Sequence, residues 1–232
     1  QGLELTLLHL GSWGNDVGRP KEEEIGRLRL RDISYYGQND FLKILRLDKP
    51  DAVLFMSTDT FSHRAFNRYC RQLKIPTLHV YHGVMRVQPV HLAARWKVSI
   101  VSQFLFALGK IPKALRHVWP CYLQSLWRTG AKLDEWLRFG SDIVQGASGR
   151  YGVIGAKDAK TDRCCVLVTS DVDQAINKYG FQKEHVVAVG LPDLINFGLG
   201  TEQIGWNLVP QSGDRTDVMY VDGGFLFVGG VF

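Results

Sequence analysis

The sequence contains no apolar run long enough to cross a membrane. The longest, residues 98–108, is interrupted by three polar residues, whereas a spanning helix needs about 20 apolar residues. Cysteine is also scarce. The four cysteines follow no metal-ligand spacing, and Cys164 and Cys165 lie in an apolar run that is typical of a buried strand. These absences exclude a disulfide-rich fold and a cysteine-based metal site, and we expect a cytoplasmic protein with reduced thiols, no metal and no other cofactor.

Acidic residues are absent from one long segment. Between Thr60 and Leu133 the chain has twelve Lys or Arg residues and no Asp or Glu, although its formal net charge is only +5. Aromatic residues are interleaved with these charges. Such a surface attracts a phosphate-bearing substrate, acidic lipid headgroups or nucleic acid, and a solvated basic face without a partner is the alternative. None of the usual signatures of nucleic-acid-binding folds is present, so we expect no nucleic-acid partner.

What the sequence does contain is an alternation of short apolar runs with longer periodic segments, which is typical of a parallel α/β sheet. The clearest helix pattern covers residues 61–73, where Arg64, Arg68 and Arg71 share a face away from the apolar side. We therefore predict a Rossmann-like parallel sheet with helices on both faces. The predicted strands are residues 3–10, 27–33, 52–56, 77–81, 164–168 and 185–189, and the predicted helices are residues 40–47, 61–73 and 171–179, the last capped by Ser170.

The same pattern predicts the domain organisation. Residues 1–197 are expected to form one Rossmann-like domain with a basic helical insertion at about residues 90–140, and residues 146–162 a mobile loop. Residues 198–216 are rich in glycine and polar residues, which suits an interdomain linker. Residues 217–232 are expected to begin a second domain. Because both ends lie inside apolar patterns, we expect a fragment of a longer protein.

Polar residues follow one of the predicted buried strands. Ser57, Thr58, Asp59 and Thr60 connect the strand at residues 52–56 to the next helix. Open parallel sheets bind ligands outside the carboxyl ends of their strands, and a helix N-terminus there favours anionic groups. The alternative is that Thr58, Asp59 or Thr60 only caps the helix. Spacing alone favours neither.

A histidine follows the next strand. His82 precedes Gly83, which places an imidazole where the backbone can approach a ligand closely, and imidazole is the usual general base near neutral pH. A histidine packed inside a loop is the alternative, and His79, within the strand, is expected to be structural. A third strand runs into a turn at Gly190, which is a weaker signal.

Together these motifs resemble a known family. Residues 49–53 (Lys-Pro-Asp-Ala-Val), the Asp59-Thr60 pair and residues 73–80 are similar to the amino-terminal domain of sugar-nucleotide enzymes with the two-Rossmann (GT-B) architecture. The non-hydrolysing UDP-N-acetylglucosamine 2-epimerases share this order, but the position of their Glu is Tyr81 here, which speaks against epimerase chemistry. Tyr81 with the following His-Gly instead resembles the Trp-His-Gly of the CDP-glycerol glycerophosphotransferases, in which that His is the proposed base.

The resemblance implies a GT-B-type glycosyltransferase fragment, mainly its acceptor-side domain, that is weakly active alone. It would transfer a sugar from a nucleotide-sugar donor to a surface-polysaccharide or lipid-linked acceptor, with His82 as the base and Asp59 orienting it or binding sugar hydroxyls. The alternatives are a relative of the UDP-sugar 2-epimerases and a non-catalytic module that binds an anionic glycan. The expected substrate-binding residues are Ser57, Thr58, Thr60, Gly83, Arg86, Ser170 and Gly190.

The segment from Arg95 to Arg138 also predicts a peripheral membrane element on the inner face of the cell membrane. It combines a helically spaced apolar stripe with basic residues, as in a helix that lies in the headgroup layer. The stripe could instead pack on the domain's own sheet or on a second subunit. The stripe is Leu115, Val118, Trp119, Tyr122, Leu126 and Trp127, and the expected membrane-contacting residues are Lys110, Lys113, Arg116, Trp119, Trp127 and Arg128.

Overall fold

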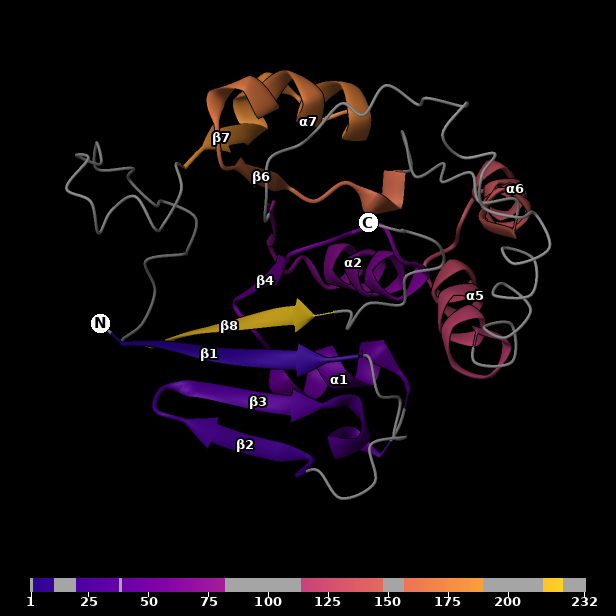
Figure 1. Ribbon diagram of the computed structural model, residues 1–232. Helices are drawn as coiled ribbons and strands as arrows, with labels where there is room; N and C mark the ends of the chain where they lie inside the picture. The colour runs from indigo at the N-terminus through magenta and orange to yellow at the C-terminus, as the bar shows by residue number, and fades with distance from the viewer. Residues whose placement is uncertain are drawn as a thin grey trace, which may run out of the picture.

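The computed structural model describes residues 2–10, 20–37, 39–81, 114–147, 157–189 and 215–222 (Figure 1). From β3 to β7, strands alternate with helical segments, as the sequence predicted. The strands are β1 (Gly2–His9), β2 (Glu22–Ile25), β3 (Leu28–Asp32), β4 (Ala52–Phe55), β5 (Thr77–Val80), β6 (Arg163–Val166), β7 (Val186–Ala188) and β8 (Arg215–Asp222). The helices are α1 (Phe41–Asp48), α2 (Phe61–Leu73), α5 (Trp119–Arg128), α6 (Leu133–Ala147) and α7 (Val172–Tyr179).

Short helical turns connect several of these elements. Four are 3₁₀ turns, and one, directly before α5, is a π-helical turn. The 3₁₀ turns are η1 (Ile33–Tyr36), η3 (Lys157–Ala159), η4 (Thr169–Asp171) and η5 (Lys183–His185), and the π-helical turn is η2 (Ala114–Val118).

The strands form one sheet in the order β2-β3-β1-β8-β4-β5-β6-β7. Every neighbouring pair is parallel except β2–β3, a hairpin whose turn contains Gly26 at φ 63°. Glycine adopts this left-handed conformation without steric cost. A parallel sheet flanked by helices is compatible with a Rossmann-like fold, so the prediction of this architecture is confirmed at that level.

The helices α1, α2 and α7 pack on one face of the sheet. Phe55 of β4 pairs with His79 of β5, which pairs with Cys164 of β6, and residues in register across a sheet point to the same face. The buried residues of α1 and α2 cluster with Phe55, and those of α7 with Cys164. The helices α1, α2 and α7 connect β3 to β4, β4 to β5 and β6 to β7, and each of these connections runs toward the β7 end of the sheet. Because such connections are right-handed, they place the three helices on the same face. The sequence predicted helices on both faces of the sheet, but the described helices that pack on the sheet lie on one face.

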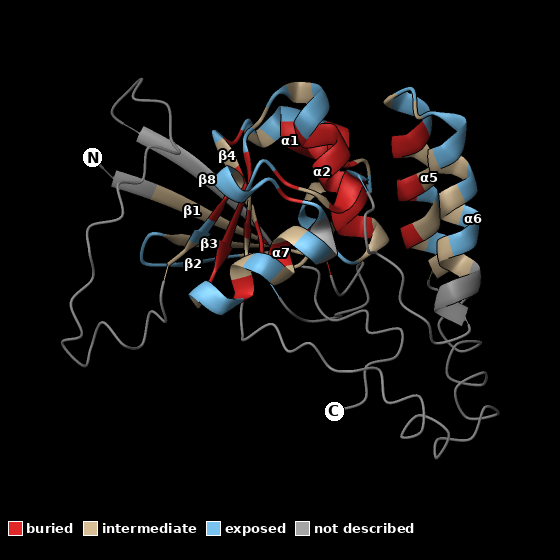
Figure 2. Ribbon diagram, turned by 90° about the horizontal axis from the view of Figure 1, so that it is seen from above, coloured by how far each residue is buried: buried red, intermediate tan, exposed pale blue. Residues whose placement is uncertain are grey.

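The helix α2 is enclosed on nearly all sides. Its residues 62–70 are all buried (Figure 2), because the sheet covers one side and α5 covers another. Towards the sheet, the Phe66 ring lies 5.3 Å from Phe41 and 6.3 Å from Phe55. Towards α5, the Phe61 ring lies 4.9 Å from Tyr122. The predicted apolar side of this helix is therefore correct, but its arginine face is buried too.

At the end of the chain the structure describes one short segment, residues 215–222. Residues 217–222, expected to begin a second domain, lie in β8 between β1 and β4. Pairing between strands so distant along the chain leaves no local sequence signal. Residues 198–214 of the expected linker, and residues 223–232, lie outside the described residues.

Ser170 does not cap α7. It lies in η4, and the helix begins after Asp171, whose side chain makes no capping hydrogen bond. The cause is an extra 3₁₀ turn before the helix, which moves the cap position one residue along the chain. In the predicted mobile loop, residues 146 and 147 end α6 and residues 157–159 form η3, while residues 148–156 lie outside the described residues.

The predicted insertion is helical over its described part, residues 114–140, which covers η2, α5 and the first half of α6. Residues 90–113 lie outside the described residues. In the portion of the chain that the structure describes, no helix combines the length and the apolar character needed to span a membrane.

Candidate functional site

The carboxyl ends of the parallel strands meet at one edge of the sheet. The arrowheads of β1, β3 and β8 point toward α5 (Figure 1). The helix α1 begins at this edge because η1 connects it to the end of β3, and α2 begins there because it follows β4. Ligands of parallel α/β sheets bind at this edge, which makes it the candidate site.

The first part of the site is the N-terminus of α2. The Thr60 Oγ1 accepts a hydrogen bond from the backbone N–H of His63 at 3.2 Å and lies 3.0 Å from the His63 Nδ1. Thr60 is therefore the helix cap, as one interpretation of the sequence held. Asp59 is exposed beside it, and its backbone N–H donates to the Ser57 Oγ at 3.2 Å. No acidic residue occupies the first turn of α2, so the partial positive charge of this helix end is not neutralised from within the turn.

Two buried polar groups lie behind this cap. Thr58 is fully buried, and within the described part of the chain its hydroxyl has no hydrogen-bond partner. The His63 Nε2 is also buried without a partner there. Burial disfavours the charged imidazolium and the neighbouring His79 adds repulsion, which together lower the pKa of His63 to about 3. His63 is thus a neutral imidazole at neutral pH, and the sequence motif did not single it out.

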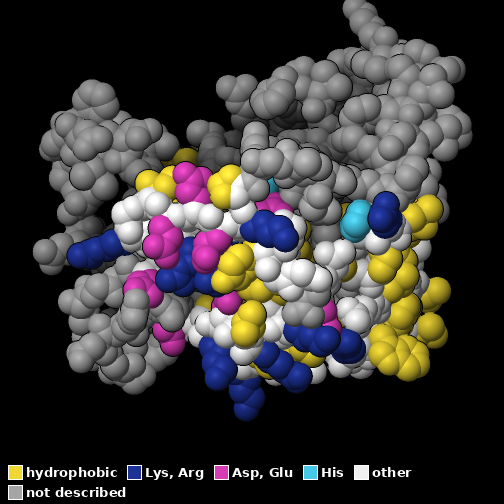
Figure 3. All heavy atoms as spheres, turned by 90° about the horizontal axis from the view of Figure 1, so that it is seen from below, with side chains coloured by type: hydrophobic (Ala, Val, Ile, Leu, Met, Phe, Trp, Pro, Cys, Tyr) yellow, Lys and Arg dark blue, Asp and Glu magenta, His cyan; other side chains and the backbone are white. Residues whose placement is uncertain are grey.

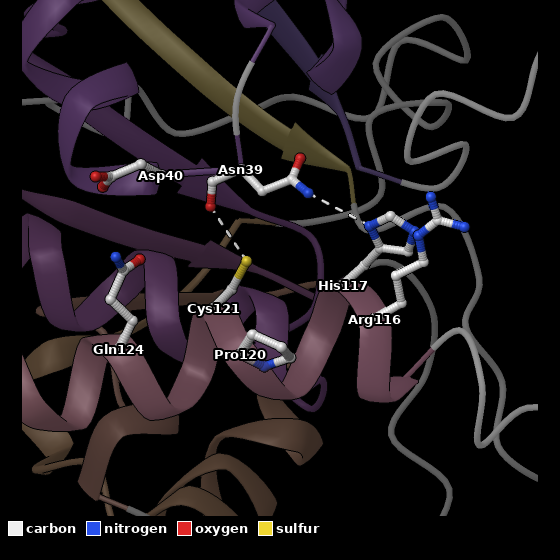
Figure 4. Close-up of a pocket in the computed structure, with 7 residues that line it drawn as sticks. All are labelled: Asn39, Asp40, Arg116, His117, Pro120, Cys121 and Gln124. Atoms are coloured by element: carbon white, nitrogen blue, oxygen red, sulfur yellow. Dashed lines mark hydrogen bonds between the residues drawn. The ribbon is translucent and has the colours of Figure 1, made fainter.

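The second part of the site is a hollow of about 350 Å³ between the N-terminus of α1 and the η2–α5 segment. The side chains of Asn39 and His117 point toward each other (Figure 4), with 3.3 Å between the Asn39 Nδ2 and the His117 Nδ1. The Cys121 Sγ donates to the Asn39 carbonyl oxygen at 3.1 Å. The residues that line the hollow are Asn39, Asp40, Arg116, His117, Pro120, Cys121 and Gln124.

The wide π-helical turn before the hollow has a cause in the sequence. Pro120 lies in the first turn of α5 and has no N–H, so it cannot donate to the carbonyl of the residue four positions earlier, Arg116. The residues before it form the π-helical turn η2, a geometry that occurs often at functional sites. This turn places Arg116 and His117 next to each other on the wall of the hollow.

Among the residues that line the hollow, Asp40 and Arg116 are charged, and only Asp40 is held in an ion pair among the described residues. The Arg128 Nη1 binds both carboxylate oxygens of Asp40, at 2.9 Å and 2.8 Å, and Asp40 also caps α1. Arg116 is exposed and takes part in none of the ion pairs formed by the described residues. Burial, with Asp40 nearby, raises the pKa of the Cys121 thiol to about 12. The thiol therefore stays protonated and does not act as a nucleophile, whereas Arg116 is a cation that an anion could bind.

A buried polar network fixes α5 against α2. The Arg64 guanidinium lies 2.9 Å from the Asp158 Oδ1 and 2.6 Å from the Asp142 Oδ2, and its Nη2 donates to the Tyr122 Oη at 2.8 Å. Tyr122 in turn donates to Asp158. Since Tyr122 follows Cys121 in the chain, this network positions the α5 wall of the hollow.

Arg68 belongs to the same inner face of α2. Its Nη1 lies 2.5 Å from the Glu135 Oε1, and its Nη2 donates to the Thr129 Oγ1 at 2.7 Å. The sequence had suggested that the basic segment forms an anion-attracting surface. For Arg64 and Arg68 this is wrong, because acidic residues from later in the chain bind both inside the protein.

The expected membrane-contacting residues have separate environments. Arg116 lines the hollow, Arg128 binds Asp40, and Trp119 packs in an edge-to-face contact 6.4 Å from Phe139. Trp127 is exposed. Val118, Tyr122 and Leu126 of the apolar stripe are buried with α2 in the main core, so this part of the stripe packs within the domain, against a helix and not directly on the sheet.

Several predicted site residues lie outside the described residues, so their prediction stays untested. Among the described residues, Ser57, Thr58, Asp59 and Thr60 lie together after β4, and Ser170 is exposed after β6. No group of described His, Cys, Asp or Glu residues is arranged to hold a metal ion. The predicted residues outside the description are His82, Gly83, Arg86, Lys110, Lys113 and Gly190.

No protein-family model matches the chain, and no curated protein or solved structure matches it either. The resemblance to the GT-B enzymes is therefore carried by the sequence motifs and by the parallel α/β architecture alone.

Proposed function

We propose that this chain is the acceptor-side part of a GT-B-type glycosyltransferase, which transfers a sugar from a nucleotide-sugar donor to a phosphate-bearing glycan or lipid-linked acceptor. The observation that carries the proposal is the hollow at the carboxyl edge of the parallel sheet, where Arg116 supplies a cation. The motif resemblance at residues 49–53 and 73–80 supports the same reading.

Three residues at this edge have separate roles in the proposed site. Arg116 binds a phosphate oxygen of the acceptor, since a guanidinium matches the geometry of phosphate. Asp59, exposed at the start of α2, binds sugar hydroxyls. His82, two residues beyond β5, is proposed as the base that takes the proton of the acceptor hydroxyl. Turnover equal to wild type in a folded His82→Ala protein would remove it from the mechanism.

Replacing Arg116 by Ala is expected to weaken the binding of inorganic pyrophosphate by roughly 10- to 100-fold, the loss of a hydrogen bond to a charged group. Pyrophosphate stands for the phosphates of the acceptor. Isothermal titration calorimetry measures the change. The matched control is Arg46→Ala, since Arg46 is also an exposed arginine but lies in the last turn of α1. Equal affinity in the Arg116 and Arg46 variants, or no binding by the wild type, would contradict the proposed site.

The two alternative functions give different results. A relative of the 2-epimerases would change the configuration of a free UDP-sugar without any acceptor, whereas the transferase needs both substrates. A non-catalytic module would bind an anionic glycan through Arg116 with no transfer even when joined to a donor-binding domain. Product analysis with and without acceptor separates the three functions.

A further inference from the structure

Large apolar side chains are exposed on the outer side of the α5–α6 pair. Trp127 is 80% exposed, Leu133 73% and Leu137 67%. Leu133 and Leu137 are four residues apart and therefore share one side of α6, and Trp127 lies in the last turn of α5, just before the connection to α6. Hydrophobic side chains gather on this side of the molecule (Figure 3). We call Trp127, Leu133 and Leu137 the outer face.

The domain does not need the outer face for its own packing. The inner sides of both helices already contact α2: Tyr122 and Leu126 of α5 are buried in the main core, and Glu135 and Asp142 of α6 bind the arginines of α2. Single exposed apolar residues are common, but a group of them on one side marks an interaction surface.

The charges near the outer face favour an anionic partner. Lys132 is exposed in the turn between Trp127 and Leu133. The two acidic residues in the first turn of α6 both have cationic partners: Glu135 binds Arg68, and Asp134 lies 3.7 Å from the Lys157 Nζ. Lys132 forms no ion pair with the other described residues, and a cation beside exposed Trp and Leu is one feature of surfaces that lie in the headgroup layer of an anionic bilayer.

We propose that the outer face docks on the surface of an anionic phospholipid bilayer. Trp127 lies at headgroup depth, where an indole has one apolar and one polar environment, Leu133 and Leu137 reach the acyl boundary, and Lys132 binds headgroup phosphates. One such contact is weak, so the docking is reversible. Because η2 continues into α5, docking also holds the hollow near the bilayer, within reach of lipid-borne phosphates. This inference does not depend on the proposed transferase activity.

Co-sedimentation with vesicles tests the proposal without any substrate. The whole chain is mixed with phosphatidylcholine vesicles or with vesicles that also contain phosphatidylglycerol. We expect binding only to the anionic vesicles, and less of it at high salt. The double variant Trp127→Ser with Leu137→Gln should reduce the partition coefficient about tenfold or more, and Lys132→Gln about fivefold. The control is Leu47→Gln, which removes a leucine that is 65% exposed on α1 and should bind as the wild type does.

Each other outcome overturns the proposal. The protein could stay in the supernatant at low salt, or the double variant could bind as tightly as the control. A further outcome is a wild-type dimer by sedimentation equilibrium that the double variant abolishes, with no vesicle binding. The outer face would then be an interface between copies of the chain. Circular dichroism confirms that each variant is folded, which we expect because the replaced side chains are mostly exposed.

Discussion

Replacing Arg64 by Leu is expected to lower the free energy of unfolding by about 3–5 kcal/mol. The Arg64 side chain is 3% exposed, and its two carboxylate partners, Asp158 and Asp142, are 5% and 9% exposed. Removing the guanidinium takes the nearest cation from both carboxylates, and leaves Asp158 and Asp142 only the longer contacts with Arg68 at 3.8 Å and Arg138 at 3.9 Å. The Tyr122 hydroxyl also loses one partner. Urea unfolding monitored by circular dichroism measures the change.

A matched variant separates this effect from the loss of any arginine. Arg46→Leu changes an exposed arginine on α1 and should alter stability by no more than about 0.5 kcal/mol. Adding Asp158→Asn to Arg64→Leu should cost less than the sum of the two single changes, because the carboxylate that lost its nearest cation is then removed as well. A loss below about 1 kcal/mol for Arg64→Leu would show that the buried network contributes little, since even one buried group left without its partner costs that much.

The sequence predicted the elements of this fold better than their arrangement. The helix over residues 61–73 was predicted with both ends correct, because its apolar spacing, the Thr60 cap and the following turn are all local signals. The strand order was not predicted, since β8 lies between β1 and β4 although it is far from both along the chain. The antiparallel strand β2 was also missed, because three of its four residues are glutamates, which are uncommon in strands.

The arginines of α2 show why a charge pattern was misread. A segment without acidic residues looks like a basic surface when only neighbours in sequence are considered. Arg64 is bound by Asp142 and Asp158, which are 78 and 94 residues away. Only the folded chain shows that Arg64 and Arg68 are neutralised by acidic residues from later in the chain. It also shows that Arg116 and Lys132, from the same segment, are exposed.

In the candidate site, too, features with a local sequence signal could be predicted, and features formed by residues distant along the chain could not. The polar residues after β4 were predicted from their position, and Thr60 as a possible cap was among the interpretations. The hollow was not predicted, because it joins Asn39 to His117, 78 residues apart. Pro120 lies in the first turn of α5. The π-helical turn before it, which presents Arg116, has no sequence signal apart from that proline.

Acid is expected to destabilise the protein through His63. Its pKa is lowered from 6.5 to about 3 in the folded state, because the imidazole is buried and close to His79. Between these two pH values the unfolded chain binds a proton at this residue that the folded chain does not bind. Each unit of pH below about 6.5 therefore lowers the free energy of unfolding by about 1.4 kcal/mol, and above that pH the residue adds no pH dependence.

Comparing the pH dependence of stability in the wild type and in a variant without His63 isolates this contribution. Replacing His63 by Gln removes the titrating group, so the loss of stability from pH 7 to pH 5 should be smaller than in the wild type by about 2 kcal/mol. Titrating groups far from residue 63 contribute equally to both proteins and cancel, whereas His79 is close enough to interact with His63. Urea unfolding across this pH range gives the two slopes, and identical slopes for wild type and His63→Gln would show that His63 is not a buried neutral imidazole in the folded protein.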